Sequence, residues 1–256
     1  MIPFKFRSEK NYALVQYNIA KDTVIPMLRM STSLENSVVL DLGCGQGGAT
    51  DALTNHSELC IGLDIAGKFV KLNQRTKFVQ ANAHFLPFKD NSFDIIVMQD
   101  VLEHVRGTER LLKEIKRVLK KKGLIYATFP PFYFPYAGHL WNLSSRVRYL
   151  PFAHLLPKGI LYPIIRSSKN IGIFSPEQII NDQETFSKLT IHRFESCCKR
   201  LNLKINLRTM KLTFTAFDMK LAILTRLYKR MNFLFHIPLM RELLIPFTLY
   251  LIENEK

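Results

Sequence analysis

Cysteine is scarce in this chain, and its placement excludes two kinds of structural framework. The four cysteines among 256 residues are Cys44, Cys60, Cys197 and Cys198. Their spacing matches neither a disulfide framework nor a zinc site. We therefore expect free thiols and a reducing, cytoplasmic compartment.

Long apolar runs are also missing. The nearest approach, residues 149–165, is broken by Pro151, Pro157, Pro163 and Lys158. A spanning helix needs about 20 predominantly apolar residues, so none is expected. The first ten residues are polar and basic without an apolar core, which argues against a signal peptide.

Acidic residues are few relative to basic ones: 21 against 36, for a net charge of +15. This excess suits nucleic acid, an anionic membrane surface or an acidic substrate, and it suits a merely solvated lysine-rich surface equally well. The chain shows no signature of an RNA-binding module. Residues 217–235 mix basic and apolar side chains like an interfacial helix, and packing of the same stretch in the core remains the alternative.

Glycine makes up only 11 residues, yet four of them gather in one turn. The apolar run Val38–Leu42 leads directly into Gly43, Gly45, Gly47 and Gly48. Glycine permits positive φ and close approach of a ligand. A strand, a glycine-rich turn and a following helix together predict a nucleotide-binding corner.

Asp41 discriminates between the ligands of such a corner. It stands two residues before the first glycine, where a carboxylate would repel a pyrophosphate. The same carboxylate would attract the sulfonium and ammonium groups of S-adenosylmethionine, which has no phosphate. Asp41 therefore argues against an NAD-linked oxidoreductase.

Three further apolar segments predict the strands that follow: Cys60–Leu63, Phe78–Gln80 and Ile95–Met98. Asp64 ends the first of them, about 20 positions after the glycine turn, where an acidic residue commonly holds a ribose diol. The loop L-P-F-K-D-N-S-F-D and the stretch L-E-H-V flank the last.

These motifs stand in the order and spacing of one family. From Val38 to Phe129 the chain resembles a class I S-adenosylmethionine-dependent methyltransferase, of the group that includes the ubiquinone and menaquinone biosynthesis enzymes. The resemblance implies a Rossmann-like, seven-stranded and mostly parallel sheet with helices on both faces. It also implies S-adenosylmethionine as co-substrate.

The resemblance assigns cofactor contacts by position. Asp41 would orient the methionine ammonium, and Asp64, with Ile65 beside it, would hold the ribose. Asn82 stands where the family commonly has an aspartate near the adenine. The full set of expected cofactor-binding residues is Asp41, Gly43, Gly45, Gly47, Asp64, Ile65, Asn82, Ala83 and Gln99.

We expect four regions: a capping helix and linker (1–36), a cofactor-binding core (37–129), an aromatic and proline-rich lid insertion (130–183) and the rest of the core (184–256). Helices are predicted over residues 8–30, with a kink at Pro26, over 107–122 and over 189–201. Strands are predicted over residues 124–129 and 203–212, with a last, antiparallel strand over 245–252.

The candidate catalytic residues are histidines. His139 follows Ala137-Gly138 in the expected lid, where a histidine that titrates near neutral pH would serve as general base. His104 follows Glu103, and adjacent residues on a helix point in different directions. That pair is therefore a poor joint metal site, and no metal is expected. His154 is a weaker candidate, and Tyr133 and Tyr136 would line the acceptor pocket or fill a core.

The sequence thus predicts methyl transfer from S-adenosylmethionine to an oxygen of a small-molecule, lipid-linked or saccharide acceptor, with peripheral membrane contact as an option. The alternatives are an RNA methyltransferase, favoured by charge alone, and a non-catalytic membrane-associated module that keeps the fold. The oligomeric state is not predicted.

Overall fold

A computed structural model of the chain describes residues 8–140, 143, 145–169, 175–211 and 237–255. The stretch 217–235, expected to be amphipathic, lies outside the described residues, as does Trp141. In the part that is described, no helix combines the length and the apolar character needed to cross a membrane.

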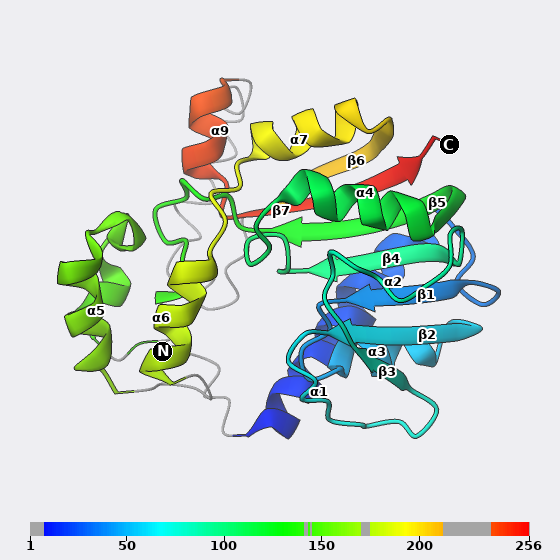
Figure 1. Cartoon of the computed structure of the whole chain (residues 1–256), viewed down its shortest axis with the longest axis horizontal. Coiled ribbons are helices and arrows are strands. Elements are labelled where there is room, and N and C mark those ends of the chain that lie inside the picture. The colour runs from blue at the N-terminus through cyan, green and yellow to red at the C-terminus, as the bar shows by residue number, and fades with distance from the viewer. Residues whose placement is uncertain (1–7, 141–142, 144, 170–174, 212–236, 256) are drawn as a thin grey trace.

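A seven-stranded sheet in the order β3-β2-β1-β4-β5-β7-β6 organises the chain (Figure 1). The first five strands are β1 (Val38–Leu42), β2 (Leu59–Asp64), β3 (Lys77–Gln80), β4 (Phe93–Gln99) and β5 (Leu119–Phe129). All of their pairings are parallel. β6 (Leu203–Lys211) and β5 both pair antiparallel with β7 (Phe247–Asn254). The expected mostly parallel sheet with an antiparallel last strand is therefore confirmed.

Alternate residues of the central strands feed two separate cores, because successive side chains point to opposite faces of a sheet. Leu40, Ile96 and Ile125 pack with α4 (Thr108–Val118) and α7 (Ile191–Arg200) on one face. Val39, Ile95 and Tyr126 pack on the other face with α2 (Ile25–Arg29) and α3 (Gly48–Thr54). The sheet is thus buried on both sides.

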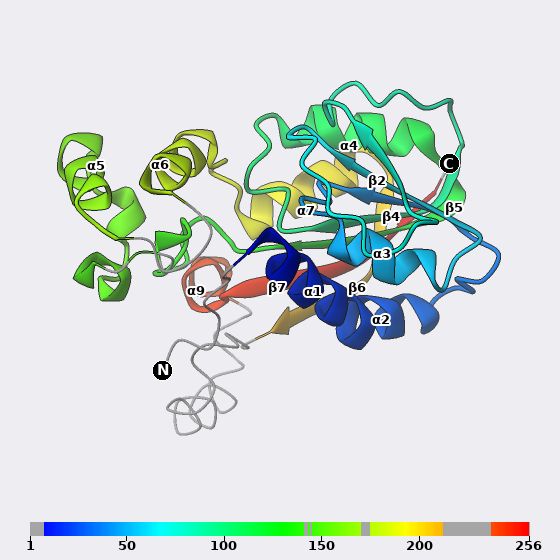
Figure 2. The same ribbon diagram turned by 90° about the horizontal axis from the view of Figure 1, so that it is seen from below.

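The leading helical segment changes type before the break expected at Pro26. It runs as α1 (Glu9–Ile19), a π-helical turn (Ala20–Val24) and α2. Pro26 lies in the first turn of α2, where its missing N–H is tolerated. α1 lies against α3 beside the sheet (Figure 2).

The predicted lid forms a group of short helices beside the carboxyl ends of the strands, at the left of Figure 1. It contains 3₁₀ turns at Arg146–Tyr149 and Ala153–Leu155, followed by α5 (Lys158–Arg166) and α6 (Pro176–Thr185). Its buried side chains, among them Leu140, Leu161 and Ile179, form a third core. α9 (Pro238–Leu244), which the sequence did not predict, precedes β7.

Two boundaries correct the sequence-based expectations. Residues 102–104 form a turn rather than the start of a helix, and α4 begins only at Thr108. α4 also ends at Val118, and the next residues belong to β5, since Leu119 pairs with Phe93. The lysines 120–122, expected to end a helix, lie instead in a strand.

Candidate active site

The glycine turn between β1 and α3 is shaped by three residues with positive φ: Gly43 (+73°), Gly45 (+54°) and Gly47 (+88°). A Cβ on Gly43 would lie 2.3 Å from Val101 Cγ2, and one on Gly47 would lie 2.4 Å from the Phe78 ring. Both sterics and backbone conformation therefore require glycine.

The carboxylate of Asp41 lies beneath this turn. Only 2% of the residue is exposed, and its Oδ2 accepts a hydrogen bond of 2.6 Å from Thr50 Oγ1. Burial, with a smaller contribution from nearby Asp64, raises the pKa of Asp41 to about 7. In the described residues neither of these acids forms an ion pair. The corner therefore carries uncompensated negative potential.

Asp64 ends β2 and faces the same turn. Its Oδ2 accepts from Gly45 N (2.9 Å), and its Oδ1 accepts from Ala66 N (2.8 Å). The bond from Gly45 joins the end of β2 to the turn after β1, and the bond from Ala66 fixes the local turn. The carboxylate therefore lies at the edge where open α/β sheets bind ligands.

The other expected cofactor residues lie at the same sheet edge, at or after the ends of β2, β3 and β4. Asn82 follows β3, and its side-chain oxygen accepts from His84 N (2.9 Å), so one lone pair is used in a turn and the other remains. Gln99 is the half-buried last residue of β4. Ile65 is 67% exposed, next to Asp64. Ala83 is half-buried beside Asn82. The structure thus brings these positions together, and their roles remain predictions.

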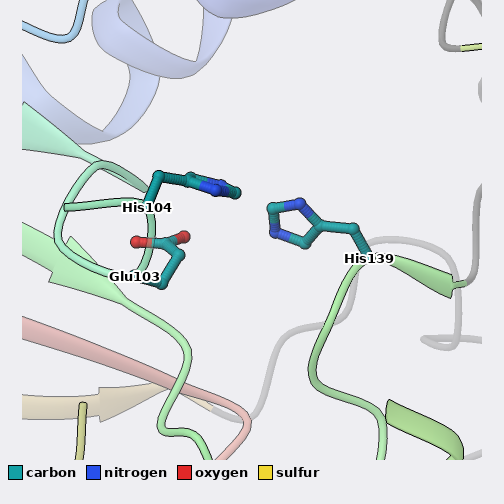
Figure 3. A group of neighbouring side chains, drawn as sticks. All are labelled: Glu103, His104 and His139. Atoms are coloured by element: carbon teal, nitrogen blue, oxygen red, sulfur yellow. The ribbon is translucent and has the colours of Figure 1, made fainter. Parts of the chain in front are cut away.

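A second cluster lies beyond the carboxyl end of β4. His104, in the turn after β4, and His139 of the lid point toward each other, and the Glu103 carboxylate lies beside His104 (Figure 3). The rings of His104 and His139 have centroids 4.9 Å apart, and the Phe186 ring lies 6.2 Å from each. Both expected catalytic histidines are therefore in one site.

The two histidines are neutral at physiological pH. Burial lowers the pKa of His104 to about 4. Burial, with the neighbouring His104, lowers the pKa of His139 to about 3. The expectation of a histidine that titrates near neutral pH is therefore wrong, because the surrounding protein disfavours the charged imidazolium. A neutral imidazole keeps a lone pair for a proton or a metal ion.

Glu103 is the most unusual residue of the cluster. It is fully buried, and neither carboxylate oxygen has a hydrogen-bond partner among the described residues. Burial and the nearby Asp100 raise the pKa of Glu103 well above its ordinary value.

Tyr12 is a site residue that the sequence analysis missed. Burial first, then the charges of Asp100, Asp182 and Glu103, raise its pKa to about 12. α1 therefore places a phenol among the carboxyl groups of the turn and the lid. No sequence signal identifies it, because the contact joins segments far apart in the chain.

The weaker candidates are placed outside this cluster's centre. A ring nitrogen of His154, Nε2, lies 2.8 Å from the backbone oxygen of Phe132, which ties together two parts of the lid. Tyr133 and Tyr136 are 43% and 36% exposed, so they do not fill a core.

Comparison with known proteins agrees with this geometry. A family described as "Methyltransferase domain" matches residues 40–127, which contain the glycine turn and the strands that follow it. The chain is 30% identical over 152 residues to a demethylmenaquinone methyltransferase of Thermotoga maritima, covering 56% of this chain and 66% of that protein. It is 24% identical over 133 residues to a ubiquinone biosynthesis O-methyltransferase of Pelagibacter ubique, covering 48% and 55%.

A solved structure with the same fold is the S-adenosylmethionine-dependent methyltransferase of Mesorhizobium loti, with a TM-score of 0.53 and 18% identity. The match covers 89% of this chain and 96% of the Mesorhizobium loti protein. The chain spans between 39% and 66% of the length of the first four curated relatives.

A Rossmann-like sheet with a glycine turn and two strand-end acids defines a nucleotide-binding α/β protein. Within that class, the chain belongs to the class I S-adenosylmethionine-dependent methyltransferases. S-adenosylmethionine is the co-substrate that this family and fold imply.

Proposed function

We propose that this protein transfers the methyl group of S-adenosylmethionine to a hydroxyl oxygen of a small, largely apolar acceptor. The observation that carries the proposal is the pair of neutral histidines, His104 of the turn after β4 and His139 of the lid, which face each other. A neutral imidazole at the carboxyl edge of the sheet can accept a hydrogen bond from a hydroxyl and so orient its oxygen toward the methyl group.

The cofactor half of the proposal rests on charge. Asp41 and Asp64 concentrate negative potential at the glycine turn, which suits the cationic methionine end and the ribose diol of S-adenosylmethionine. Asn82, Ala83, Ile65 and Gln99 would complete the contacts along the same edge.

The acceptor half rests on the lid and the relatives. The Phe186 ring lies 6.2 Å from each histidine ring and 5.9 Å from the tilted ring of Phe132, which favours an apolar acceptor. Two relatives are named for quinone biosynthesis or quinone methylation. An acceptor of lipid-like solubility is the class that fits both observations.

Such an acceptor resides in membranes, and the lid offers a surface to reach it. Tyr149, Leu150, Phe152, Leu155 and Ile160 are all more than a third exposed. Arg146 and Arg148 directly precede this stretch, and Lys158 lies within it. Exposed apolar side chains interspersed with cations suit an anionic bilayer surface.

The test is methyl transfer itself. Protein incubated with S-adenosylmethionine labelled in the methyl group should label quinol and phenolic lipid fractions rather than RNA. His139→Ala should lower the turnover while leaving S-adenosylhomocysteine affinity unchanged. Labelled RNA, or full turnover by the variant, would contradict the proposal.

A further inference from the structure

The turn at residues 102–104 makes a joint site that a helix would forbid. His104 N donates to Val101 O (2.9 Å), and Ser187 N donates to Glu103 O (2.6 Å), so the backbone of the turn is fixed at both ends. The side chains of Glu103 and His104 consequently converge on one region, as Figure 3 shows. Adjacent residues on a helix would diverge.

His139 is held in place from the opposite side by strained backbone. Its φ is +59°, a conformation that is uncommon for a residue with a Cβ. The preceding Gly138 has φ +84°, and its carbonyl accepts a hydrogen bond from the Gln183 side chain of α6. Strain that the surroundings maintain is typical of functional sites.

The buried carboxylate supplies the second, independent observation. Glu103 is completely buried, and its two oxygens lack hydrogen-bond partners among the described residues. Burying an unpaired carboxylate is costly, and buried charges are normally paired or coordinate a metal ion. A cation beside Glu103 would remove this cost.

The ligand atoms of Glu103, His104 and His139 all lie within 4.8 Å of one another. Zinc binds imidazole nitrogen and carboxylate oxygen at roughly 2.0–2.2 Å. For the three side chains to close around an ion, rotations that move their ligand atoms by on the order of 1 Å are therefore sufficient. Two imidazoles and one carboxylate favour zinc or iron(II) over magnesium or calcium, and they leave coordination positions open.

We propose that Glu103, His104 and His139 form a binding site for a divalent transition-metal ion of the zinc or iron(II) type, placed where the acceptor hydroxyl must lie. The expectation that no metal is bound assumed a helix at Glu103 and His104, and the turn removes that assumption.

The role in catalysis rests on the proposed function. The acceptor oxygen occupies an open position on the ion, which lowers the pKa of the hydroxyl, and its proton leaves to solvent. An oxygen lone pair then forms the bond to the methyl carbon of the sulfonium. The carbon–sulfur bond breaks at the same time, and its electron pair stays on sulfur as the thioether of S-adenosylhomocysteine.

The experiment titrates the full chain, stripped with a chelator, with Co²⁺ and follows the visible absorption of the bound ion. One equivalent should bind with spectral bands of a four- or five-coordinate site. Glu103→Gln, His104→Ala and His139→Ala should each weaken binding by about 10-fold or more. His192→Ala, which removes an exposed histidine of α7, serves as the matched control and should bind normally.

Two further measurements keep the outcomes distinct. Glu103, His104 and His139 lie outside the glycine turn, so substitutions there should not affect cofactor binding directly. A variant that still binds S-adenosylhomocysteine is therefore folded. Co²⁺ binding that all three substitutions leave unchanged overturns the metal site. Undiminished methyl transfer after chelation overturns the catalytic role of the metal ion and leaves the proposed methyltransferase function standing. Metal binding without cofactor binding overturns the proposed function and leaves the metal site standing.

Discussion

Asp41 is a buried acid whose ionisation is linked to both folding and cofactor binding. Its pKa rises from an ordinary 3.8 to about 7 because it is buried, with Asp64 nearby. An acid with a raised folded pKa binds its proton more tightly in the folded state. The free energy of unfolding must therefore fall as pH rises from about 4 to about 7.

Replacing Asp41 by Asn should flatten this dependence. Between pH 4 and pH 8 the wild-type protein should lose a few kcal/mol more of unfolding free energy than Asp41→Asn, on the order of 1.4 kcal/mol per pKa unit. Urea unfolding of both proteins at several pH values measures this difference. The contributions of other titrating groups cancel when the two proteins are compared. Parallel pH profiles for the two proteins would contradict the raised pKa.

The affinity for the cofactor should depend on pH in the opposite direction to stability. S-adenosylmethionine is cationic, so it favours the ionised carboxylate and its affinity should rise with pH through about 7. Asp41→Asn should bind more weakly at pH 8 and show little pH dependence. Calorimetric titration at pH 6 and pH 8 makes the comparison.

Asp64 acts on the ribose side of the same corner. Asp64→Ala removes the acceptor of two backbone N–H groups and of the proposed ribose hydroxyls. We expect S-adenosylhomocysteine affinity to fall by about 1–3 kcal/mol. Glu58→Ala removes an exposed acid just before the other end of β2 and should leave the affinity unchanged. Equal affinities of Asp64→Ala and wild type would remove Asp64 from the site.

At the scale of elements, α1 and α3 meet so closely that one methyl group tests the contact. A Cβ on Gly48 would lie 1.9 Å from the backbone oxygen of Ala13. Alanine normally stabilises a helix by about 1 kcal/mol over glycine. Here Gly48→Ala should instead destabilise by about 1–3 kcal/mol, because α1 must move.

Gly159 provides the matched comparison, since a Cβ at this position in α5 meets nothing within 4 Å. Gly159→Ala should raise stability by about 0.4–1 kcal/mol. Thermal unfolding of both variants shows whether each substitution raises or lowers the stability. A stabilised Gly48→Ala would show that α1 does not pack on the start of α3 as described.

The elements that the sequence predicts well are those specified by local pattern. β1, β2 and β4 are apolar runs that end at turn residues, so their positions follow from the sequence to within two residues. The turn at 102–104 escaped prediction because Val101, Leu102 and Val105 have helical spacing. What prevents a helix there is distant: Ser187 bonds to the carbonyl oxygens of Leu102 and Glu103.

The candidate site divides in the same way. Asp41, Asp64 and the glycines follow from a motif within one segment of the chain. The meeting of His139 with Glu103 and His104 depends on how the lid folds over the sheet, and Tyr12 depends on where α1 lies. Long-range packing of this kind leaves no periodic signal in the sequence, and so the buried carboxylate and the low pKa values of the histidines could not be predicted.

At the scale of the whole molecule, a basic chain exposes apolar side chains in its lid, next to Arg146, Arg148 and Lys158. The chain has a net charge of +15, and exposed apolar residues from Tyr149 to Ile160 lie in and around the two 3₁₀ turns and α5. α5 projects away from the sheet in both Figure 1 and Figure 2. A bilayer could therefore meet this surface without contacting the sheet.

We expect the protein to sediment with vesicles that contain phosphatidylglycerol and to remain in solution with pure phosphatidylcholine. The double variant Leu150→Ser/Ile160→Ser should weaken binding, since each side chain is about half exposed and would lose its contact with the acyl region. Met30→Ser, at the end of α2 away from α5 in Figure 2, removes an even more exposed apolar side chain (77%) and should have no effect. If high salt releases the protein while the double variant binds as wild type does, charge alone drives the association and the lid is not the contact surface.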